Sequence, residues 1–383
     1  MSLIEIKKVE SKKDLKTFID FHYDLYEGNE YDVPNLFSDE MNTLRQDKNA
    51  AFEFCEAEYY LAYKDGKLAG RVAAIINHKA NNKWGKKSVR FGWIDFIDDR
   101  EVSKALLDAV EKYGREKGME DMVGPLGFTD MDPEGMLTWG FDQLGTMPTI
   151  YNYPYYPEHI EALEGFEVDN KYVEFKIMVP DTIPEKYAKI AMMIEKRYNL
   201  HVRKLTKKEI FQGGMGQKIF DLINDTYKDL YGYSELSQKQ IDQLIKSYLS
   251  FLDFNLITCI EDWTGGEHKL IGVGITMPSL AHALRKCRRG RLLPFGWYHV
   301  LRAIKQHKTN IVDLLLIGIL PEYRAKGANA LLFADLIPWY QKYGIEWGET
   351  QVELETNVGV QGQWGALTPV MHKRRKCYKK IIK

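Results

Sequence analysis

The sequence predicts an α/β fold with mixed sheets, arranged as two tandem domains, and three observations support this prediction. The chain has 383 residues, which is more than one typical domain. The order hairpin, strand, amphipathic helix, strand occurs twice along it. Antiparallel hairpins and parallel strand–helix–strand crossovers must therefore share each sheet. We expect the boundary near the proline-flanked residues 179–185, so that the domains span 1–180 and 181–383.

In the first repeat, apolar stretches on either side of Asp65 and Gly66 predict a hairpin, because Asp-Gly suits a type I′ turn. An apolar strand is expected at 89–97. Apolar residues then recur at helical spacing over 100–118, a segment that ends in a glycine C-cap. A last strand is expected at 121–128.

In the second repeat, the hairpin is expected to turn at Gly265 and Gly266. A strand at 311–320, a helix at 328–344 and a strand at 349–356 complete the same order. Further helices are predicted for 14–26, 187–198 and 217–252.

An insertion near 279–309 lengthens the second repeat. It contains the basic run RKCRRGR (285–291), followed by a stretch with apolar residues at helical spacing. The pattern fits a lid over a cofactor, a contact for a cofactor phosphate, or a surface for anionic lipid or RNA. It fits equally a solvated basic loop that docks one helix on the core, and the sequence leaves these alternatives open.

Composition excludes several classes of protein. Hydrophobic residues make up 45% and charged residues 28%, which excludes a disordered chain. No apolar run approaches the roughly 20 residues that cross a bilayer, and the start MSLIEIKKVE lacks the apolar region of a secretory signal. The four cysteines lie far apart and the nine histidines lack metal-ligand spacing, which argues against a disulfide framework and a metal site. A cytoplasmic protein is predicted.

Charge is distributed unequally along the chain. Residues 1–180 carry 22 Lys and Arg against 34 Asp and Glu, whereas residues 181–383 carry 31 against 20. Either the second domain binds an anion, or the two halves of the sequence attract each other. The sequence leaves both interpretations open.

The segment LLLIGILPEYRAKGANALL (314–332) carries the strongest functional signal. A buried strand is expected to end at Pro321, and a helix to begin after the turn that holds Arg324, Lys326 and Gly327. A helix N-terminus offers unpaired N–H groups and partial positive charge, and glycine lets the main chain approach a ligand. Two cations beside such a terminus favour a diphosphate site.

This segment resembles the acetyl-CoA-binding motif of the GNAT N-acyltransferase superfamily, in which apolar–x–Pro–Glu–Tyr leads to R-x-x-G-x-G/A at the start of a long helix. The matching residues are Ile319, Pro321, Glu322, Tyr323, Arg324 and Gly327. Asn329 departs from the pattern, which has Gly or Ala there. The order of segments over 250–383 also resembles the GNAT core. The resemblance therefore implies two tandem GNAT-like domains, with acetyl-CoA or another acyl-CoA as co-substrate.

In the resembled superfamily, pantetheine pairs with the main chain of the strand that precedes the diphosphate loop. The resemblance implies a cofactor-binding set from this strand and loop: Ile317, Gly318, Ile319, Arg324, Ala325, Lys326, Gly327, Ala328 and Asn329. Gly318 inside a strand would permit such a close approach, or would mark a bulge.

Acyl transfer to an amine needs a base for the amine and an acid for the leaving thiolate. Asp313 is one candidate base, since some GNAT members keep a carboxylate at about this place, although it also fits a solvated strand-start residue. Glu353 and Glu355 on the next strand are further candidates. The resemblance implies a tyrosine acid after that strand, but the stretch contains Trp364 and no tyrosine. Tyr378 in the terminal strand is the remaining candidate acid.

The first domain resembles a GNAT domain without the diphosphate motif. The acidic residues 98–101 stand at the corresponding helix start, where they would repel phosphates. A tract of tyrosines interleaved with prolines follows, which is typical of a pocket wall or of a packing loop between domains. We expect this tract to face the thioester end of the second domain and to shape the acceptor site through Tyr151, Tyr153, Tyr155 and Tyr156.

The sequence-based hypothesis is an acyl-CoA-dependent N-acyltransferase that moves an acyl group, most simply acetyl, to an amine of a small molecule or peptide. The alternatives are a non-catalytic CoA-binding sensor or scaffold, and a Fem-like transferase that uses aminoacyl-tRNA. The excess of cations in 181–383 favours a nucleic-acid partner only mildly. No oligomeric state is predicted.

Overall fold

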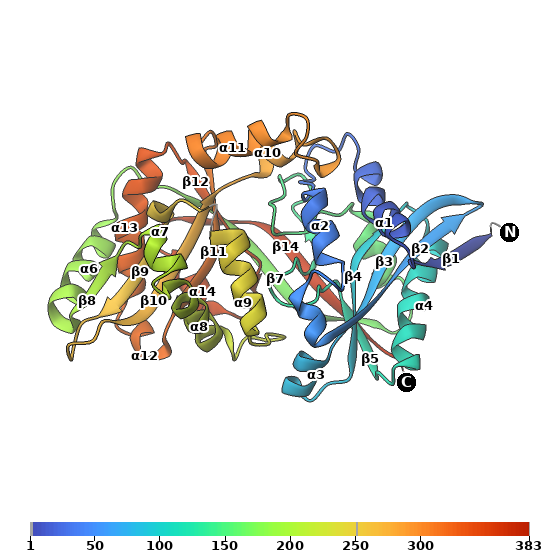
Figure 1. Ribbon diagram of the computed structural model, residues 1–383, viewed down its shortest axis with the longest axis horizontal. Helices are drawn as coiled ribbons and strands as arrows, with labels where there is room; N and C mark the ends of the chain where they lie inside the picture. The colour runs from blue at the N-terminus through green and yellow to red at the C-terminus, as the bar shows by residue number, and fades with distance from the viewer. Residues whose placement is uncertain (1–2, 250–251, 383) are drawn as a thin grey trace. The chain divides into compact units, whose positions relative to one another are not determined.

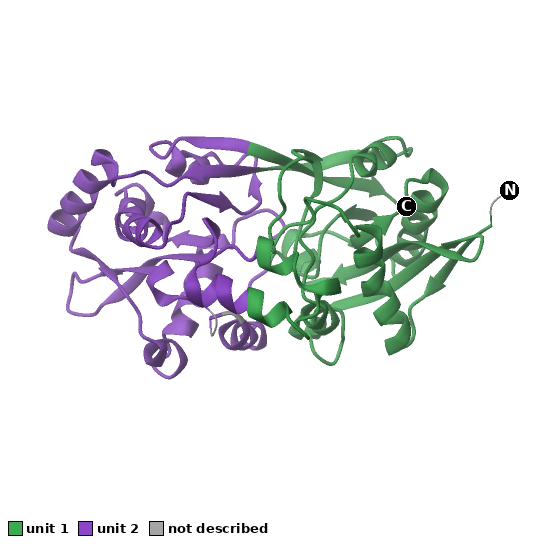
Figure 2. Ribbon diagram, turned by 90° about the horizontal axis from the view of Figure 1, so that it is seen from above, with its two compact units in different colours: residues 1–173, 281–299, 372–383 green, residues 174–280, 300–371 purple. Residues whose placement is uncertain are grey.

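The computed structural model describes residues 3–249 and 252–382, which form two compact units (Figure 2). Unit 1 comprises residues 1–173, 281–299 and 372–383, and unit 2 comprises residues 174–280 and 300–371.

The units do not follow a single cut in the sequence at residue 180. Residues 281–299 of the insertion and residues 372–383 at the end of the chain belong to unit 1, although they come from the second half of the sequence. Two segments covered by the sequence analysis, the first two residues and residues 250–251 of the predicted helix 217–252, lie outside the described residues.

Unit 1 is built from the elements of the first repeat, part of the insertion and the last strand. These are β1 (Ile4–Lys8), α1 (Lys12–Leu25), α2 (Phe37–Thr43), the 3₁₀ turn η1 (Ala50–Glu53), β2 (Cys55–Lys64), β3 (Lys67–Asn77), α3 (His78–Trp84), β4 (Ser88–Phe96), α4 (Arg100–Glu116), β5 (Asp121–Gly124), β6 (Met136–Trp139), α5 (Tyr155–Glu161), the first part of β7 (Phe166–Met178), α10 (Ala281–Leu284), the 3₁₀ turn η4 (Arg288–Gly290), the first part of α11 (Gly296–Gln306) and most of β14 (Pro369–Ile381).

The sheet of unit 1 runs in the order β1-β2-β3-β4-β5-β14, and β6 pairs with β14. β4 and β5 are parallel, and the other neighbouring pairs are antiparallel. Helix α1 packs on one face and α4 on the other (Figure 1). Successive residues of β3 therefore point to different cores: Ala73 and Ile75 pack with α1, and Ala74 and Ile76 pack with α4.

The predicted hairpin and helix of the first repeat are confirmed. Asp65 and Gly66 both have positive φ, 49° and 77°, as a type I′ turn requires. Strands β2 and β3 pair along their whole length on either side of this turn. Helix α4 is followed by Gly118 with φ 71°, the left-handed conformation that ends many helices.

Unit 2 contains the second repeat. Its elements are the last part of β7, α6 (Glu185–Tyr198), β8 (Leu200–Arg203), α7 (Lys207–Phe211), α8 (Met215–Tyr227), α9 (Gln238–Leu244), the π-helical turn η2 (Ile245–Leu249), the 3₁₀ turn η3 (Phe254–Leu256), β9 (Ile257–Asp262), β10 (Lys269–Pro278), the last part of α11, β11 (Ile311–Ile319), α12 (Pro321–Arg324), α13 (Asn329–Lys342), β12 (Trp347–Thr350), β13 (Glu353–Leu354), α14 (Val358–Gln361) and the 3₁₀ turn η5 (Gly362–Trp364).

The sheet of unit 2 runs β12-β11-β10-β9-β8, with the last residues of β7 paired to β12. Only β11 and β12 are parallel. Helices α6 and α13 pack together on one side, and α8 packs on β10 and β11 (Figure 1). The predicted strand 349–356 is interrupted and forms β12 and the short β13, while the predicted helix 328–344 is α13. These elements surround the strand edge on which the candidate site is built.

Charge is balanced within each unit, unlike along the sequence. Residues 281–299 bring five cations into unit 1 and residues 372–383 bring seven, with no Asp or Glu. Unit 1 then holds 33 Lys and Arg against 33 Asp and Glu, and unit 2 holds 20 against 21. Direct pairs include Lys380–Glu111 and Lys376–Glu161, each 2.7 Å. The attraction between the two halves of the sequence thus accounts for the asymmetry.

Candidate functional site

In unit 2, the parallel strands β11 and β12 pair only over their first residues. Their register runs from Ile311 opposite Trp347 to Leu314 opposite Thr350. β11 then continues to Ile319, where its register with β10 on the other side is maintained. The second half of β11 therefore presents a main-chain edge that β12 does not pair.

Tyr227, the last residue of α8, contacts this edge. Its hydroxyl donates to the carbonyl of Ile317 (3.1 Å) and accepts from the amide of the same residue (3.3 Å). Burial raises the pKa of Tyr227 to about 12, so the hydroxyl keeps its proton at neutral pH. Helix α8 can lie this close because Gly318 has no side chain: a Cβ there would be 2.7 Å from the Thr226 hydroxyl. Gly318 thus makes room for a helix, and the irregularity of β11 lies at Leu315.

The start of α13 has the features that a diphosphate site needs. Gly327 has φ 80°, in the left-handed region that favours glycine. α13 begins at Asn329 without a side-chain cap. Among the hydrogen bonds of the described residues, none is donated by the amides of Ala328 and Asn329. These amides are free for an anion at the positive end of the helix dipole.

The two cations of this turn have different contacts. Arg324 donates from Nε to the carbonyl of Ile319 (2.8 Å) and from Nη2 to the carbonyl of Thr226 (3.2 Å). It therefore ties the turn to β11 and α8. Lys326 lies 4.2 Å above the ring of Tyr323, and within the described residues its amino group makes no ion pair. Lys326 is the cation that a bound anion can recruit, while Arg324 holds the turn in shape.

Glu353, on β13, is the candidate base with the most distinctive surroundings. Its side chain is buried, and Oε1 accepts from the indole N–H of Trp364 (3.0 Å). Oε2 has no hydrogen-bond partner within the described chain. Burial raises the pKa of Glu353 to about 7, although the Trp364 hydrogen bond acts in the opposite direction. A carboxyl group with this pKa and one free oxygen is suited to accept a proton at neutral pH.

Glu353 acts electrostatically on Tyr227. After burial, the charge of Glu353 is the second cause that raises the pKa of Tyr227, because a nearby negative charge disfavours the phenolate. Tyr227, which the sequence analysis did not single out, thus contacts the main chain of Ile317 and is within the electrostatic reach of Glu353.

The other predicted bases lie elsewhere in unit 2. Asp313 is fully buried in the paired half of β11, opposite Met277 of β10 and Glu349 of β12. The interpretation of Asp313 as a solvated residue at the strand start is therefore wrong. Glu355 is half-buried after β13, and its carbonyl accepts from the side chain of Gln361 (3.2 Å). Catalytic roles for Asp313 and Glu355 stay predictions.

Unit 1 has the same strand–turn–helix arrangement, but its helix start is capped. The Asp99 carboxylate accepts from two amides of the first turn of α4, at 3.0 and 3.3 Å. The neighbouring Asp98 lies 3.0 Å from Nε2 of His159. An internal carboxylate thus occupies the amides whose counterparts remain free in unit 2.

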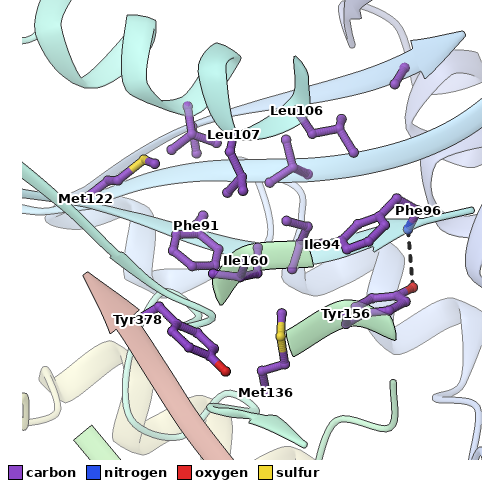
Figure 3. Close-up of a cluster of buried hydrophobic side chains, with 14 of the residues drawn as sticks. Phe91, Ile94, Phe96, Leu106, Leu107, Met122, Met136, Tyr156, Ile160 and Tyr378 are labelled. Carbon is purple, nitrogen blue, oxygen red and sulfur yellow. Dashed lines mark hydrogen bonds between the residues drawn. The ribbon is translucent and has the colours of Figure 1, made fainter. Parts of the chain in front are cut away.

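The edge of β4 in unit 1 is covered by α5. The Tyr156 hydroxyl accepts from the amide of Phe96 (3.2 Å), as Figure 3 shows, and the Tyr155 hydroxyl donates to the carbonyl of Phe96 (2.7 Å). The rings of Tyr156 and Phe96 stack with centroids 4.2 Å apart. Two tyrosines of the aromatic tract therefore close the edge that corresponds to the open half of β11.

A cavity of about 80 Å³ lies within unit 1, and two of the four predicted acceptor residues, Tyr151 and Tyr156, line it. One water needs about 10–15 Å³, so the cavity can hold several waters or a short polar group. Tyr153 and Tyr155 are not among its lining residues; their rings stack with centroids 5.6 Å apart. Whether the tract faces the thioester end of the other unit stays a prediction.

Buried charged groups line the same cavity. Asp95 accepts from Nε of Arg71 (2.8 Å) and from the Tyr156 hydroxyl (3.1 Å), and lies 3.1 Å from Nδ1 of His22. Asp32 lies 3.4 Å from Nε2 of His22. Burial lowers the pKa of His22, but Asp32 and Asp95 outweigh it and raise that pKa to about 10. Burial raises the pKa of Asp95, but Arg71 and His22 outweigh it and lower that pKa to about 2. His22 is thus a protonated, paired imidazolium.

Tyr378, the predicted acid, belongs to the core of unit 1 (Figure 3). Its hydroxyl donates to Oε1 of Glu161 (2.9 Å). Burial and this carboxylate raise the pKa of Tyr378 far above its usual range. Glu353 lies in unit 2, so a shared role for the two residues in acyl transfer stays a prediction.

Sequence reasoning missed Tyr227, the Glu353–Trp364 contact and the His22 network. Nothing in the local sequence marks the Tyr227 hydroxyl, because its partner is the main chain of a residue 90 positions away. Asp95, in contrast, carries a readable signal. It interrupts the apolar strand FGWIDF, as Asp313 interrupts its own strand.

Three further features complete the description. The four cysteines are buried free thiols. In the part of the chain that the structure describes, no helix combines the length and apolar character needed to cross a bilayer. Over residues 3–249 and 252–382, the His, Cys, Asp and Glu side chains form no group suited to a metal ion.

Comparison with characterised proteins finds two distant relatives along the whole chain. "Protein YghO" of Escherichia coli is 25% identical over 377 residues, which cover 97% of this chain and 94% of that protein. "Bacterial ceramide synthase" of Caulobacter vibrioides is 24% identical over 373 residues, which cover 93% of this chain and 94% of that protein. No family model matches the sequence.

Among solved structures, the tandem GNAT protein from the clavulanic acid biosynthesis pathway, without acetyl-CoA, matches with a TM-score of 0.57. The match covers 100% of this chain and 99% of that one, at 11% identity. The chain therefore has the tandem GNAT fold, which confirms the predicted fold class.

Proposed function

We propose that this chain is an acyl-CoA-dependent N-acyltransferase whose acyl donor binds in unit 2. The observation that carries the proposal is the uncapped start of α13, where Lys326, Gly327 and the free amides of Ala328 and Asn329 lie at the end of a strand with an unpaired edge. Free amides, a cation and a left-handed glycine suit a diphosphate.

In this proposal, each residue of the site has a distinct role. The amides at the start of α13 and the amino group of Lys326 bind the diphosphate of acyl-CoA. The main chain of Ile317 pairs with the pantetheine amides once the Tyr227 hydroxyl releases it. The amine nitrogen attacks the thioester carbon, and Glu353 accepts the proton that the amine loses. The carbon–sulfur bond then breaks, and the leaving thiolate takes a proton from solvent to become the thiol.

The distant relative named a ceramide synthase supplies a substrate class. Ceramide formation joins a fatty acyl group to the amine of a long-chain amino alcohol. We therefore place a long-chain acyl-CoA ahead of acetyl-CoA, and a long-chain amino alcohol ahead of a peptide amine. The predicted acceptor role of the tyrosine tract stays part of this proposal, supported by the cavity that Tyr151 and Tyr156 line with Asp32.

The test is thiol release from acetyl-CoA and palmitoyl-CoA in the presence of sphinganine, ethanolamine or a short peptide, with mass spectrometry of the amide product. We expect an amide from palmitoyl-CoA and sphinganine. Thermal stabilisation by acyl-CoA without thiol release for any amine would instead favour the sensor, because a ligand that binds the native state raises the midpoint. Absence of both would overturn the proposal. An amide from acetyl-CoA and ethanolamine alone would overturn only the lipid substrate class.

A further inference from the structure

The residues that follow the basic run expose an unusual concentration of apolar side chains. The exposed fractions are 77% for Leu293, 73% for Phe295, 46% for Trp297, 47% for Tyr298 and 44% for Leu301. Five of the fifteen large hydrophobic residues that are exposed in the described chain thus fall within nine residues of sequence. A single exposed apolar residue is normal, whereas a contiguous group marks an interaction surface.

The exposed residues form one side of α11 and the turn before it. Trp297 and Leu301 are one helical turn apart, and Lys305, a further turn on, is also exposed. Ala303 on the opposite side is buried, and so is Ile304, which borders the exposed side. The helix therefore packs through Ala303 and Ile304 and leaves Trp297, Tyr298 and Leu301 exposed to solvent, so apolar side chains lie on both of its sides.

The same segment is strongly basic. Residues 281–306 contain seven Lys and Arg and no Asp or Glu. Arg289 and Arg291 pair with acids of α1, so they attach the segment to unit 1. Lys286 and Arg288 are exposed, and within the described residues their side chains make neither an ion pair nor a hydrogen bond. Some cations thus hold the segment in place, and others remain free for an external anion.

We propose that this basic-aromatic segment, residues 285–305, binds the surface of an anionic phospholipid bilayer. Trp and Tyr prefer the headgroup level, and exposed Leu and Phe gain by leaving water for the acyl boundary. Free Lys and Arg are attracted to the negative surface. RNA would use the cations and the aromatic rings but offers nothing for Leu293 and Leu301, so the observations favour lipid. The inference goes beyond acyl transfer and rests on none of its residues.

The test is sedimentation of the full chain with vesicles of phosphatidylcholine alone, or of phosphatidylcholine mixed with phosphatidylglycerol, without any acyl-CoA. We expect binding to the mixed vesicles that weakens with added salt. The double variant Phe295→Ala/Trp297→Ala should weaken it at least about tenfold, because burying one aromatic side chain provides about that factor or more. Lys286→Gln/Arg288→Gln should weaken it about 25-fold, roughly fivefold for each cation.

Matched controls come from the same unit. Trp139 is 51% exposed on β6, and Lys67 is exposed beside the first hairpin turn. Trp139→Ala and Lys67→Gln should leave vesicle binding unchanged. If the double variant fails to fold, Trp297→Phe serves instead: mixed vesicles should shift the tryptophan emission of the wild type to shorter wavelength, and the shift should be lost in this variant.

Three outcomes would overturn the proposal. The wild-type protein remains in the supernatant with mixed vesicles; or the segment variants bind as well as the control variants; or the protein retards single-stranded RNA, loses this in Lys286→Gln/Arg288→Gln, and ignores vesicles. Because no acyl-CoA is present, a missing acyltransferase activity would leave this result unaffected.

Discussion

The two units present the same strand–turn–helix arrangement in opposite states. In unit 1, Asp99 caps α4, and Tyr155 and Tyr156 occupy the main chain of Phe96 at the edge of β4. In unit 2, α13 is uncapped and a single tyrosine, Tyr227, contacts the edge of β11. The fold alone therefore does not provide an anion site at the helix start. The site depends on a few side chains that either satisfy these main-chain groups or leave them for a ligand.

Buried charge shows the same contrast. Asp95 of unit 1 is surrounded by Arg71, His22 and Tyr156, which stabilise its charged form and lower its pKa to about 2. Glu353 of unit 2 has one oxygen without a hydrogen-bond partner, and burial raises its pKa to about 7 against the hydrogen bonds from Trp364 and Thr350. A carboxylate whose oxygens all have charged or hydrogen-bonding partners stabilises the fold, whereas a carboxylate with an unpartnered oxygen is available for proton transfer.

The largest expected effect comes from Glu353→Gln, which removes the proposed base. We expect kcat/KM to fall by about 10²–10⁴, the usual contribution of a general base. In the wild type, kcat/KM should rise with pH through about 7, because only the deprotonated carboxylate accepts a proton. The variant should lack this rise. Rates of thiol release over a pH series provide the measurement.

Trp364→Phe sharpens this prediction. It removes the hydrogen bond that lowers the pKa of Glu353, so the rise in kcat/KM should move to higher pH while the plateau changes less. Glu355→Gln, two residues away, is the matched control. If Glu355→Gln reduced kcat/KM as much as Glu353→Gln did, the contrast drawn from burial would be wrong.

The buried charges of unit 1 should affect stability and its pH dependence instead. His22 has a folded-state pKa of about 10, raised from 6.5, so its stabilising contribution is complete below pH 6.5 and is lost as pH rises through about 10. The contribution should be about 2–5 kcal/mol, since one pKa unit corresponds to about 1.4 kcal/mol. Urea unfolding of the wild type and of His22→Gln at both pH values tests it. Between the lower and the higher pH, the free energy of unfolding of the wild type should fall by this contribution. An equal fall in His22→Gln would contradict the assignment.

Much of the difference between the two units could be predicted from the sequence. The features that could not be predicted depend on contacts between residues far apart in the sequence. Asp65-Gly66 and the helical spacing of 100–118 are local signals, and both are confirmed. The turn expected to hold Arg324 is in part the short helix α12, whereas the long helix does begin after Gly327 as predicted. The acids at 98–101 also showed that the first helix start was unsuited to phosphate. Tyr227, in contrast, acts on the main chain of a residue far along the sequence, and pairing at that distance leaves no local pattern.

The sequence also did not predict which unit the basic segments join, for a related reason. The sequence showed that residues 281–299 and 372–383 are basic, but not which sheet or helix they join. β14 pairs with β5 in register from Tyr378 opposite Gly124, a contact between residues more than two hundred positions apart. Strand order in a sheet is set by such pairings, whereas composition gives the charge of a segment but not the strand or helix that it pairs with.

The two helix starts can be compared by substitution. Gly327→Ala forces a Cβ into a left-handed conformation, and this Cβ would lie 3.2 Å from Cγ2 of Ile190. Relaxation of the turn should redirect the free amides and weaken CoA binding about tenfold, in line with about 1–2 kcal/mol for the strain. Asp99→Ala should lower the free energy of unfolding by about 1 kcal/mol and leave CoA binding unchanged. Calorimetric titration with CoA and urea unfolding measure both; equal losses of affinity would remove the distinction between the units.

The smallest expected effect concerns the tyrosines at the two strand edges. Tyr227→Phe removes the hydroxyl that occupies the main chain of Ile317. The free protein should become less stable by about 1–3 kcal/mol, because a buried amide and carbonyl lose their partner. CoA should then bind about fivefold more tightly, since pantetheine no longer competes with the hydroxyl and restores the lost hydrogen bonds.

Tyr156→Phe is the matched change in unit 1, where the hydroxyl joins Asp95 and the amide of Phe96. It should cost a similar amount of stability and leave CoA binding unchanged, because no ligand replaces the lost partner. A gain in affinity confined to Tyr227→Phe would show that the edge of β11, and not that of β4, is the one that acyl-CoA pairs with. If Tyr227→Phe instead lowered kcat with unchanged CoA affinity, the hydroxyl would be a proton donor, and its contact with Ile317 would hold it ready for that role rather than compete with the substrate.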